Sequence, residues 1–134
     1  MFVNTLTKNE KKAFLEIAHI IAKSNGYVDE KEQALLDQYA HEMYIIDEDV
    51  YQLQNISLEE VLANIESEQS KRVIFLESIA LAFADGIYHE EQRNIIKQIK
   101  DTFGFSDEIY KEYKQWVIDI SKLYVKGFNL VAGE

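Results

Sequence analysis

Apolar residues recur at helical spacing through most of this chain. The pattern predicts helices over residues 8–23, 30–43, 70–84 and 90–103, and a long final helix from 106 to about 127. Two shorter helices are predicted between them, one beginning at Asp47 and one over about 57–66. Capping signals mark several helix starts, and Thr7 with Glu10 has the spacing of a capping box. These elements predict an all-α fold, a bundle of about seven helices.

Two of the predicted helices are apolar on nearly every side. The helix over 8–23 carries Phe14, Ile17 and Ile21, and the helix over 70–84 carries Ile74 and Phe75 among other large apolar residues. A helix without a polar face must be covered by other elements to keep its apolar surface from water. We therefore expect these two helices to contact each other at the centre of the bundle.

The chain also contains an approximate internal repeat. A shift of 60 residues places Gly26 on Gly86 and Glu30 on Glu90. The Phe-Leu-Glu triplets at 14–16 and 75–77 align only after one further residue of shift, so the duplication is approximate. We predict a single domain over 1–134 whose repeats, 8–60 and 68–124, form a pseudo-two-fold bundle.

The composition limits which cell compartment and which kinds of site are expected. The chain has 134 residues and no cysteine, which excludes a disulfide framework and a thiolate zinc site. Residues 1–10 lack the basic start and apolar stretch of a signal peptide, and no apolar run approaches the roughly 18 residues that suggest a membrane span. We expect a cytoplasmic protein without direct membrane insertion.

The net charge of −10 is concentrated in the middle of the chain. Between Glu32 and Ser70 there is no lysine or arginine, whereas ten acidic residues fall in that stretch. Such a surface repels phosphate backbones and anionic lipids, so we expect no nucleic-acid partner. Solvated helix faces account for most such charge runs, and a basic protein partner or a cation is the functional alternative. The oligomeric state stays open.

Each central helix is followed by a glycine-containing loop. The loops read Ser-Asn-Gly-Tyr-Val-Asp-Glu-Lys-Glu over 24–32 and Ala-Asp-Gly-Ile-Tyr-His-Glu-Glu-Gln over 84–92. This repeated pattern resembles the tellurite-resistance TerB family of helical domains, over residues 10–117. The resemblance implies a seven-helix domain of bacterial stress and metal-resistance systems, without enzyme activity. It also implies divalent-cation binding through the Asp before each Gly and the Glu seven residues after that Asp.

This sequence departs from the family's loop pattern at two of those four positions. Asn25 replaces the first Asp and Gln92 replaces the second Glu, which leaves Asp85 and Glu32. Hard cations are held mainly by carboxylate oxygens, so we expect at most weak calcium or magnesium binding and no other cofactor. Its candidate ligands are Asp85, Glu32, Asp29 and Glu90.

A purely structural explanation of the loops is complete without a metal. Gly26 and Gly86 suit the positive φ that follows a helix end, and Asp29 with Glu32 suits the cap of the next helix. An EF-hand is excluded, because placing either glycine at loop position six puts Ile21 or Leu81 where the first ligand belongs.

No motif in the sequence predicts catalysis. His41-Glu42 and His89-Glu90 lack the second histidine of a zinc protease. His19 lies on an apolar helix, where a buried histidine with a hydrogen-bond partner is commoner than a ligand. We therefore expect no enzyme. The leading hypothesis is a non-enzymatic interaction or regulatory module, and the alternative is a weak divalent-cation-binding protein.

The apolar tail over 125–132 follows the predicted end of the last helix at Gly127. It either folds back onto the bundle or binds a partner. Folding back is favoured, because an apolar patch left in water is costly.

Overall fold

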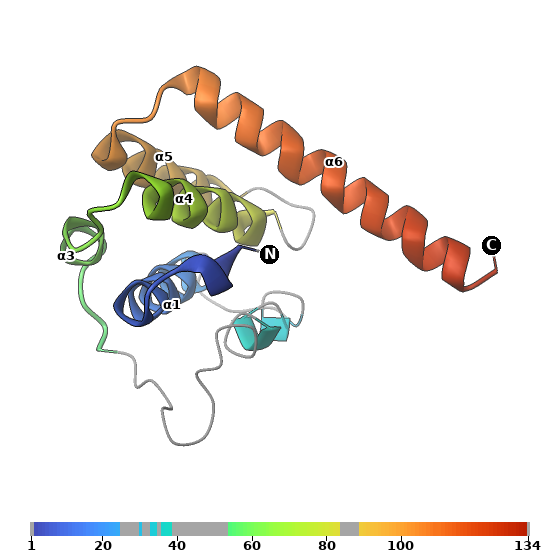
Figure 1. Cartoon of the computed structure of the whole chain (residues 1–134), viewed down its shortest axis with the longest axis horizontal. Coiled ribbons are helices and arrows are strands. Elements are labelled where there is room, and N and C mark those ends of the chain that lie inside the picture. The colour runs from blue at the N-terminus through green and yellow to red at the C-terminus, as the bar shows by residue number, and fades with distance from the viewer. Residues whose placement is uncertain are drawn as a thin grey trace.

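The computed structural model describes residues 2–24, 30, 33–34, 36–38, 54–83 and 89–133 of the chain. Their regular elements are a short 3-10 helix η1 (Val3–Thr5) and the helices α1 (Lys8–Lys23), α3 (Leu58–Ala63), α4 (Glu68–Ala82), α5 (Glu90–Phe103) and α6 (Asp107–Val131). The all-α prediction is confirmed (Figure 1).

The predicted boundaries agree closely where capping signals were strong. The bounds of α1 and α5 are those predicted, whereas α3 and α4 differ by two or three residues at one end or both. Of the predicted helix over 30–43, residues 30, 33–34 and 36–38 are described, and they are helical. The predicted helix beginning at Asp47 lies outside the described residues, as do Gly26 and Gly86.

Side-chain caps explain where α1, α3, α4 and α6 begin. The Thr7 hydroxyl accepts from the Glu10 amide at 3.2 Å while the Glu10 carboxylate accepts from the Thr7 amide at 2.9 Å, which is the predicted capping box. Ser57, Ser67 and Ser106 each cap the following helix through the amide three residues on. Gly104 takes φ 77° after α5, in the left-handed conformation that ends a helix.

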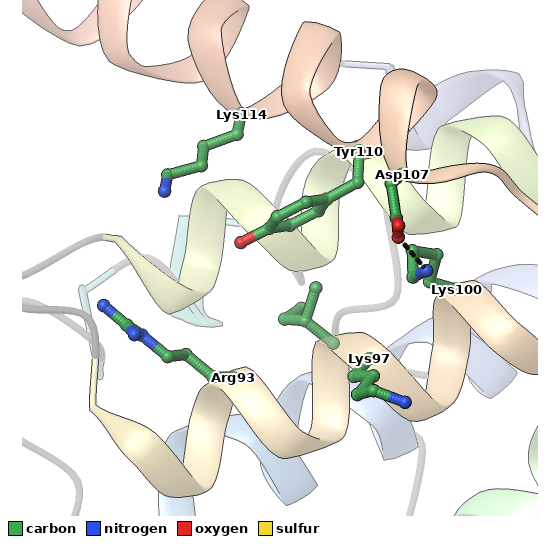
Figure 2. Close-up of a pocket in the computed structure, with 7 residues that line it drawn as sticks. Arg93, Lys97, Lys100, Asp107, Tyr110 and Lys114 are labelled. Carbon is green, nitrogen blue, oxygen red and sulfur yellow. Dashed lines mark hydrogen bonds and ion pairs between the residues drawn. The ribbon is translucent and has the colours of Figure 1, made fainter.

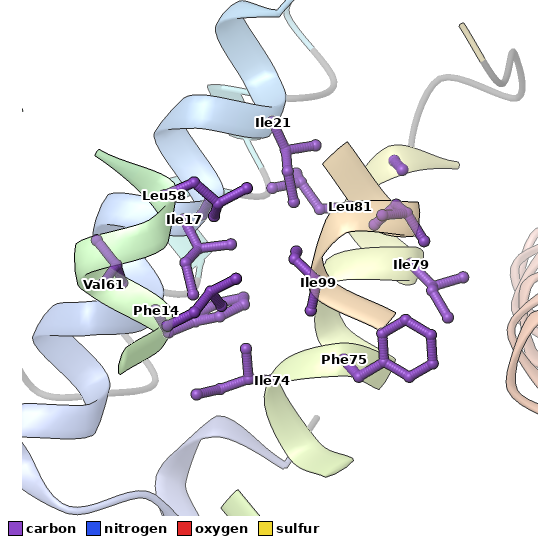
Figure 3. Close-up of a cluster of buried hydrophobic side chains, with 14 of the residues drawn as sticks. Phe14, Ile17, Ile21, Leu58, Val61, Ile74, Phe75, Ile79, Leu81 and Ile99 are labelled. Atoms are coloured by element: carbon purple, nitrogen blue, oxygen red, sulfur yellow. The ribbon is translucent and has the colours of Figure 1, made fainter. Parts of the chain in front are cut away.

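The core forms around the contact between α1 and α4. Figure 3 shows Phe14, Ile17 and Ile21 of α1 facing the same interior as Ile74 of α4, and all four are fully buried. Besides α1, α4 also contacts α5, α6 and η1. The expected central contact between the two most apolar helices is thereby confirmed, while the pseudo-two-fold relation of the two halves stays a prediction.

A group of aromatic rings fastens the first half of α6 to α4. The Phe75 ring stacks on Phe105 at 5.1 Å between centroids and lies 6.3 Å from Tyr110 and 5.7 Å from Tyr113. Offset and tilted pairs at these separations add to the stabilisation that burial gives. In the described part of the chain, α6 is the longest helix, yet no helix there is long and apolar enough to cross a membrane.

We expect Phe75→Ala to lower the free energy of unfolding by about 3–5 kcal/mol, because the fully buried ring leaves a cavity between α4 and α6. Phe75→Leu, which keeps most of the volume, should lose clearly less. Urea unfolding followed by circular dichroism measures both. Equal losses for the two variants would show that the cavity is not what destabilises the protein.

Candidate functional site

Two carboxylates lie inside the bundle, and both hold backbone amides. Glu16 of α1 is 3% exposed, and its oxygens accept from the amides of Gln54 at 2.9 Å and Asn55 at 3.2 Å. Asn55 has φ 54°, a left-handed conformation that asparagine tolerates better than most residues. Glu16 therefore anchors the segment that leads into α3.

Glu77 does the same for the N-terminal segment. It is fully buried on α4 and accepts from the Phe2 amide at 2.7 Å. Sequence reasoning missed both residues. The signal was present, because a glutamate in the middle of a helix that is otherwise apolar must find a hydrogen-bond partner inside.

The segments that flank the two glycine loops meet in the structure. The Gln92 side-chain amide, on the first turn of α5, donates to the Ile21 carbonyl near the end of α1 at 3.4 Å, and Gln92 is 1% exposed. Gln92 leads out of the second loop and Ile21 leads into the first. Gln92, the neutral residue at the position where the family pattern has a glutamate, thus packs against the first repeat.

The predicted cation ligands are placed in part. Asp85, Glu32 and Asp29 lie outside the described residues, whereas Glu90 is exposed as the first residue of α5. Across the residues that the structure describes, no three His, Cys, Asp or Glu side chains gather as a metal site would require.

A pocket of about 340 Å³ lies between α5 and the first half of α6 (Figure 2). Four of its seven lining residues are cationic. The lining consists of Arg93, Ile96, Lys97, Lys100, Asp107, Tyr110 and Lys114. In Figure 2 the Arg93 and Lys114 side chains approach from opposite helices, and the Tyr110 hydroxyl points into the space between them. The sequence signal is the helical spacing of Arg93, Lys97 and Lys100, which places them on one side of α5. The apolar pattern used to predict α5 does not include these residues.

The charge of this pocket favours an anion over a cation. Asp107 is the one acidic group in the lining and is paired with Lys100. The hydrogen bond from Lys100 lowers the pKa of Asp107, and the same contact raises the pKa of Lys100. The Lys114 ammonium lies over the Tyr110 ring at 5.9 Å, a cation–π contact that orients it along the pocket wall. Lys97 and Lys100 also pair with Asp101, so part of the positive charge of the lining is balanced within the chain.

The C-terminal half of α6 exposes a continuous apolar surface. We call this surface the overhang face; it comprises Leu123, Tyr124, Phe128, Leu130 and Val131, while the exposed Val125 lies on another side of the helix. Phe128 is 73% and Val131 89% exposed. Figure 1 shows why, since α6 runs well past the ends of α4 and α5.

The expectation that the apolar tail folds back is therefore wrong. Gly127 lies inside α6 without a positive φ and does not end the helix. The glycine with a positive φ is Gly133, which takes φ 83° after the C-cap Ala132. A glycine within a helix costs only about 1 kcal/mol relative to alanine, which the neighbouring helical residues override. The tail is a straight continuation of the helix.

Comparison with known proteins establishes the fold. No protein-family model matches the chain, and no curated protein matches it. A crystal structure of a tellurite resistance protein from Nostoc punctiforme is similar with a TM-score of 0.72 and 23% identity, covering 96% of this chain and 84% of that one. The resemblance to TerB-like helical domains is thus confirmed at the level of fold.

His19 is the ionisable group of α1 with a perturbed environment. Its ring is half-buried, and burial lowers its pKa below 6.5, helped by Lys23 and opposed by Glu16. Its Nδ1 has no hydrogen-bond partner among the described residues, so the predicted partner is not found there. The folded protein therefore prefers the neutral ring.

A lowered histidine pKa means that the unfolded chain binds the proton more tightly. Stability from this group is present above the unfolded pKa and is lost as the pH falls toward the folded pKa. We expect the melting temperature to fall between about pH 7.5 and 5.5, and to fall less steeply in His19→Gln. Proton NMR of the His19 ring reads the pKa directly. Equal slopes, or a ring pKa at or above 6.5, would contradict the assignment.

Proposed function

We propose that this chain is a non-enzymatic interaction module of TerB-like fold that serves in bacterial stress response or in resistance to tellurite or metals. The observation that carries the proposal is the overhang face. A contiguous exposed apolar surface on a folded protein marks a contact with another molecule, because leaving it in water is unfavourable. We take the contact to be with a protein chain, because the net charge of −10 disfavours an anionic lipid surface.

The buried polar groups support a non-enzymatic role. Catalytic carboxylates need access to substrate, whereas Glu16 and Glu77 lie inside the bundle and accept from backbone amides. The Gln92 side chain, also buried, donates to the Ile21 carbonyl of the first repeat. These groups therefore maintain the fold.

The biological setting comes from the fold comparison. The similar structure from Nostoc punctiforme is that of a tellurite resistance protein, and we extend that setting to this chain as part of the proposal. Exposed carboxylates on α3, in the linker after it and at the start of α4 would speed the approach of a basic partner and repel an anionic one. They are Glu59, Glu60, Glu66 and Glu68.

We expect deletion of the gene for this chain to lower the tellurite tolerance of its host, and the wild-type gene to restore it. A Leu123→Glu, Phe128→Glu double variant should fail to restore tolerance, because it places charge in the overhang face. Asn129→Glu, on the polar side of the same helix, should restore it. The minimum inhibitory concentration of tellurite measures all three. Unchanged tolerance after deletion would contradict the proposed setting.

The alternative is weak binding of a divalent cation by the loop carboxylates. The observation that favours it is the hydrogen bond from Gln92 to Ile21, which joins the flanks of the two loops at one place in the bundle. Asp85 would be the central ligand, with Glu32, Asp29 and Glu90 beside it.

We expect little change in melting temperature with millimolar calcium or magnesium. A ligand at about a hundred times its dissociation constant would stabilise the fold by roughly 2.7 kcal/mol, which raises the melting temperature by several degrees. Thermal melts of the wild type and of Asp85→Ala, with and without each ion, decide the matter. A rise that Asp85→Ala abolishes would favour the cation-binding alternative.

A further inference from the structure

The overhang face continues the seam along which α6 packs in its own bundle. Tyr110, Tyr113 and Val117 occupy the packed part of that seam, and Val117 is 2% exposed. The same alternation of three and four residues then runs through Ile120, Tyr124, Gly127 and Val131. This is the spacing that two helices keep along a shared contact.

Polar residues of the overhang are confined to the opposite side of the helix. Lys122, Lys126 and Asn129 fall between the apolar residues in sequence, but at about 100° per residue they project away from the overhang face. This segment therefore has the pattern of a helix that is buried along one side. No described element covers it (Figure 1).

We propose that the overhang face pairs with the same face of a second copy of this chain, the two α6 helices lying antiparallel about a two-fold axis. The proposal rests on the proposed function as an interaction module and names its partner. The self-complementarity of the face, its length and its area all support a second copy.

An antiparallel pair sets large side chains opposite small ones. Placing Tyr124 opposite Gly127 of the second copy also places Leu123 opposite Phe128 and Ile120 opposite Val131, since each pair has the same sum of residue numbers. Gly127 has no heavy atom within 4 Å of the position a Cβ would take, so an approaching tyrosine ring has room there. The lysines of both copies stay on the outer sides.

The length of the overhang suits this register. Beyond Val117 the helix continues for about 21 Å to Val131, at 1.5 Å per residue. Opposite Ile120, the second helix reaches its own end at Val131, where the bundle of the first copy begins. In this register each overhang runs beside the other over the stretch from Ile120 to Val131.

The exposed area approaches that of a standard-size interface. The five side chains of the overhang face expose on the order of 600 Å² together, taking about 150–250 Å² for a large side chain in full. A standard-size interface buries about 800 Å² on each partner. Two overhang faces pressed together approach this size.

Sedimentation equilibrium of the full chain tests the pairing. We expect a wild-type mass of twice 15.6 kDa at micromolar concentration, and the monomer mass for Leu123→Glu, Phe128→Glu with its helix content retained. Lys122→Glu, Asn129→Glu, on the polar side, should remain dimeric. A wild-type monomer, or a dimer that the apolar-face variant leaves intact, would overturn the proposal.

The antiparallel register has its own test, because the chain has no cysteine. Mixing Tyr124→Cys protein with Gly127→Cys protein under mild oxidation should give mainly the mixed disulfide dimer. Predominant dimers of like with like would show a parallel pair and overturn the register.

Other occupants give different results in the same experiments. A monomer that floats with phosphatidylcholine vesicles, and loses this in the apolar-face variant, would assign the face to a lipid surface. A wild-type monomer whose apolar-face variant still fails to restore tellurite tolerance would overturn self-pairing while leaving the interaction module intact. Normal tolerance in the deletion strain combined with a dimer would overturn the proposed setting alone.

Discussion

The structure depends on the burial of α4. This helix carries Ile74, Phe75 and Ile79, whose side chains have no exposed surface. A helix of this kind is unstable until other elements enclose it. The contact with α1 provides the first cover, and α5, α6 and η1 provide the rest. The positions of the candidate sites follow from this enclosure, since α5 and α6 meet at their pocket because both lie against α4.

Two buried carboxylates pair with backbone amides, which apolar side chains cannot do. The Phe2 amide before η1 and the Gln54 and Asn55 amides before α3 have no partner within a helix, and they would be costly to bury unpaired. Glu77 and Glu16 accept from these amides, so the two most buried helices also hold the irregular parts of the chain. Glu16 and Glu77, the charged residues that interrupt the apolar pattern of α1 and α4, therefore hold the segments before α3 and η1 in place.

The helices could be predicted because the residues that mark their ends lie within a few positions of one another. The candidate sites were harder to predict because their residues come from distant parts of the sequence. Thr7, Ser106 and Gly104 mark helix ends through bonds or dihedrals within a few residues, which sequence alone reveals. The end of α6 was misjudged at Gly127, since a single helical glycine reads like a stop. The basic pocket joins Arg93 to Lys114 across two helices, and the amide partners of Glu16 lie 38 and 39 residues away. Such partners become known only once the packing is known.

The length of α6 explains why part of its apolar side lies outside the described bundle. At 1.5 Å per residue α6 is about 37 Å long and α4 about 22 Å, so a helix laid along α4 must leave part of its length uncovered. A solvent-exposed extension would be expected to carry polar residues all round, whereas this one sorts them to one side as the packed half does. Aromatic rings bind the first half of that side to α4 within the chain, and the second half repeats the same spacing with no described helix packed against it. The apolar pattern thus extends beyond the described bundle, and the proposed pairing of two α6 helices would bury it.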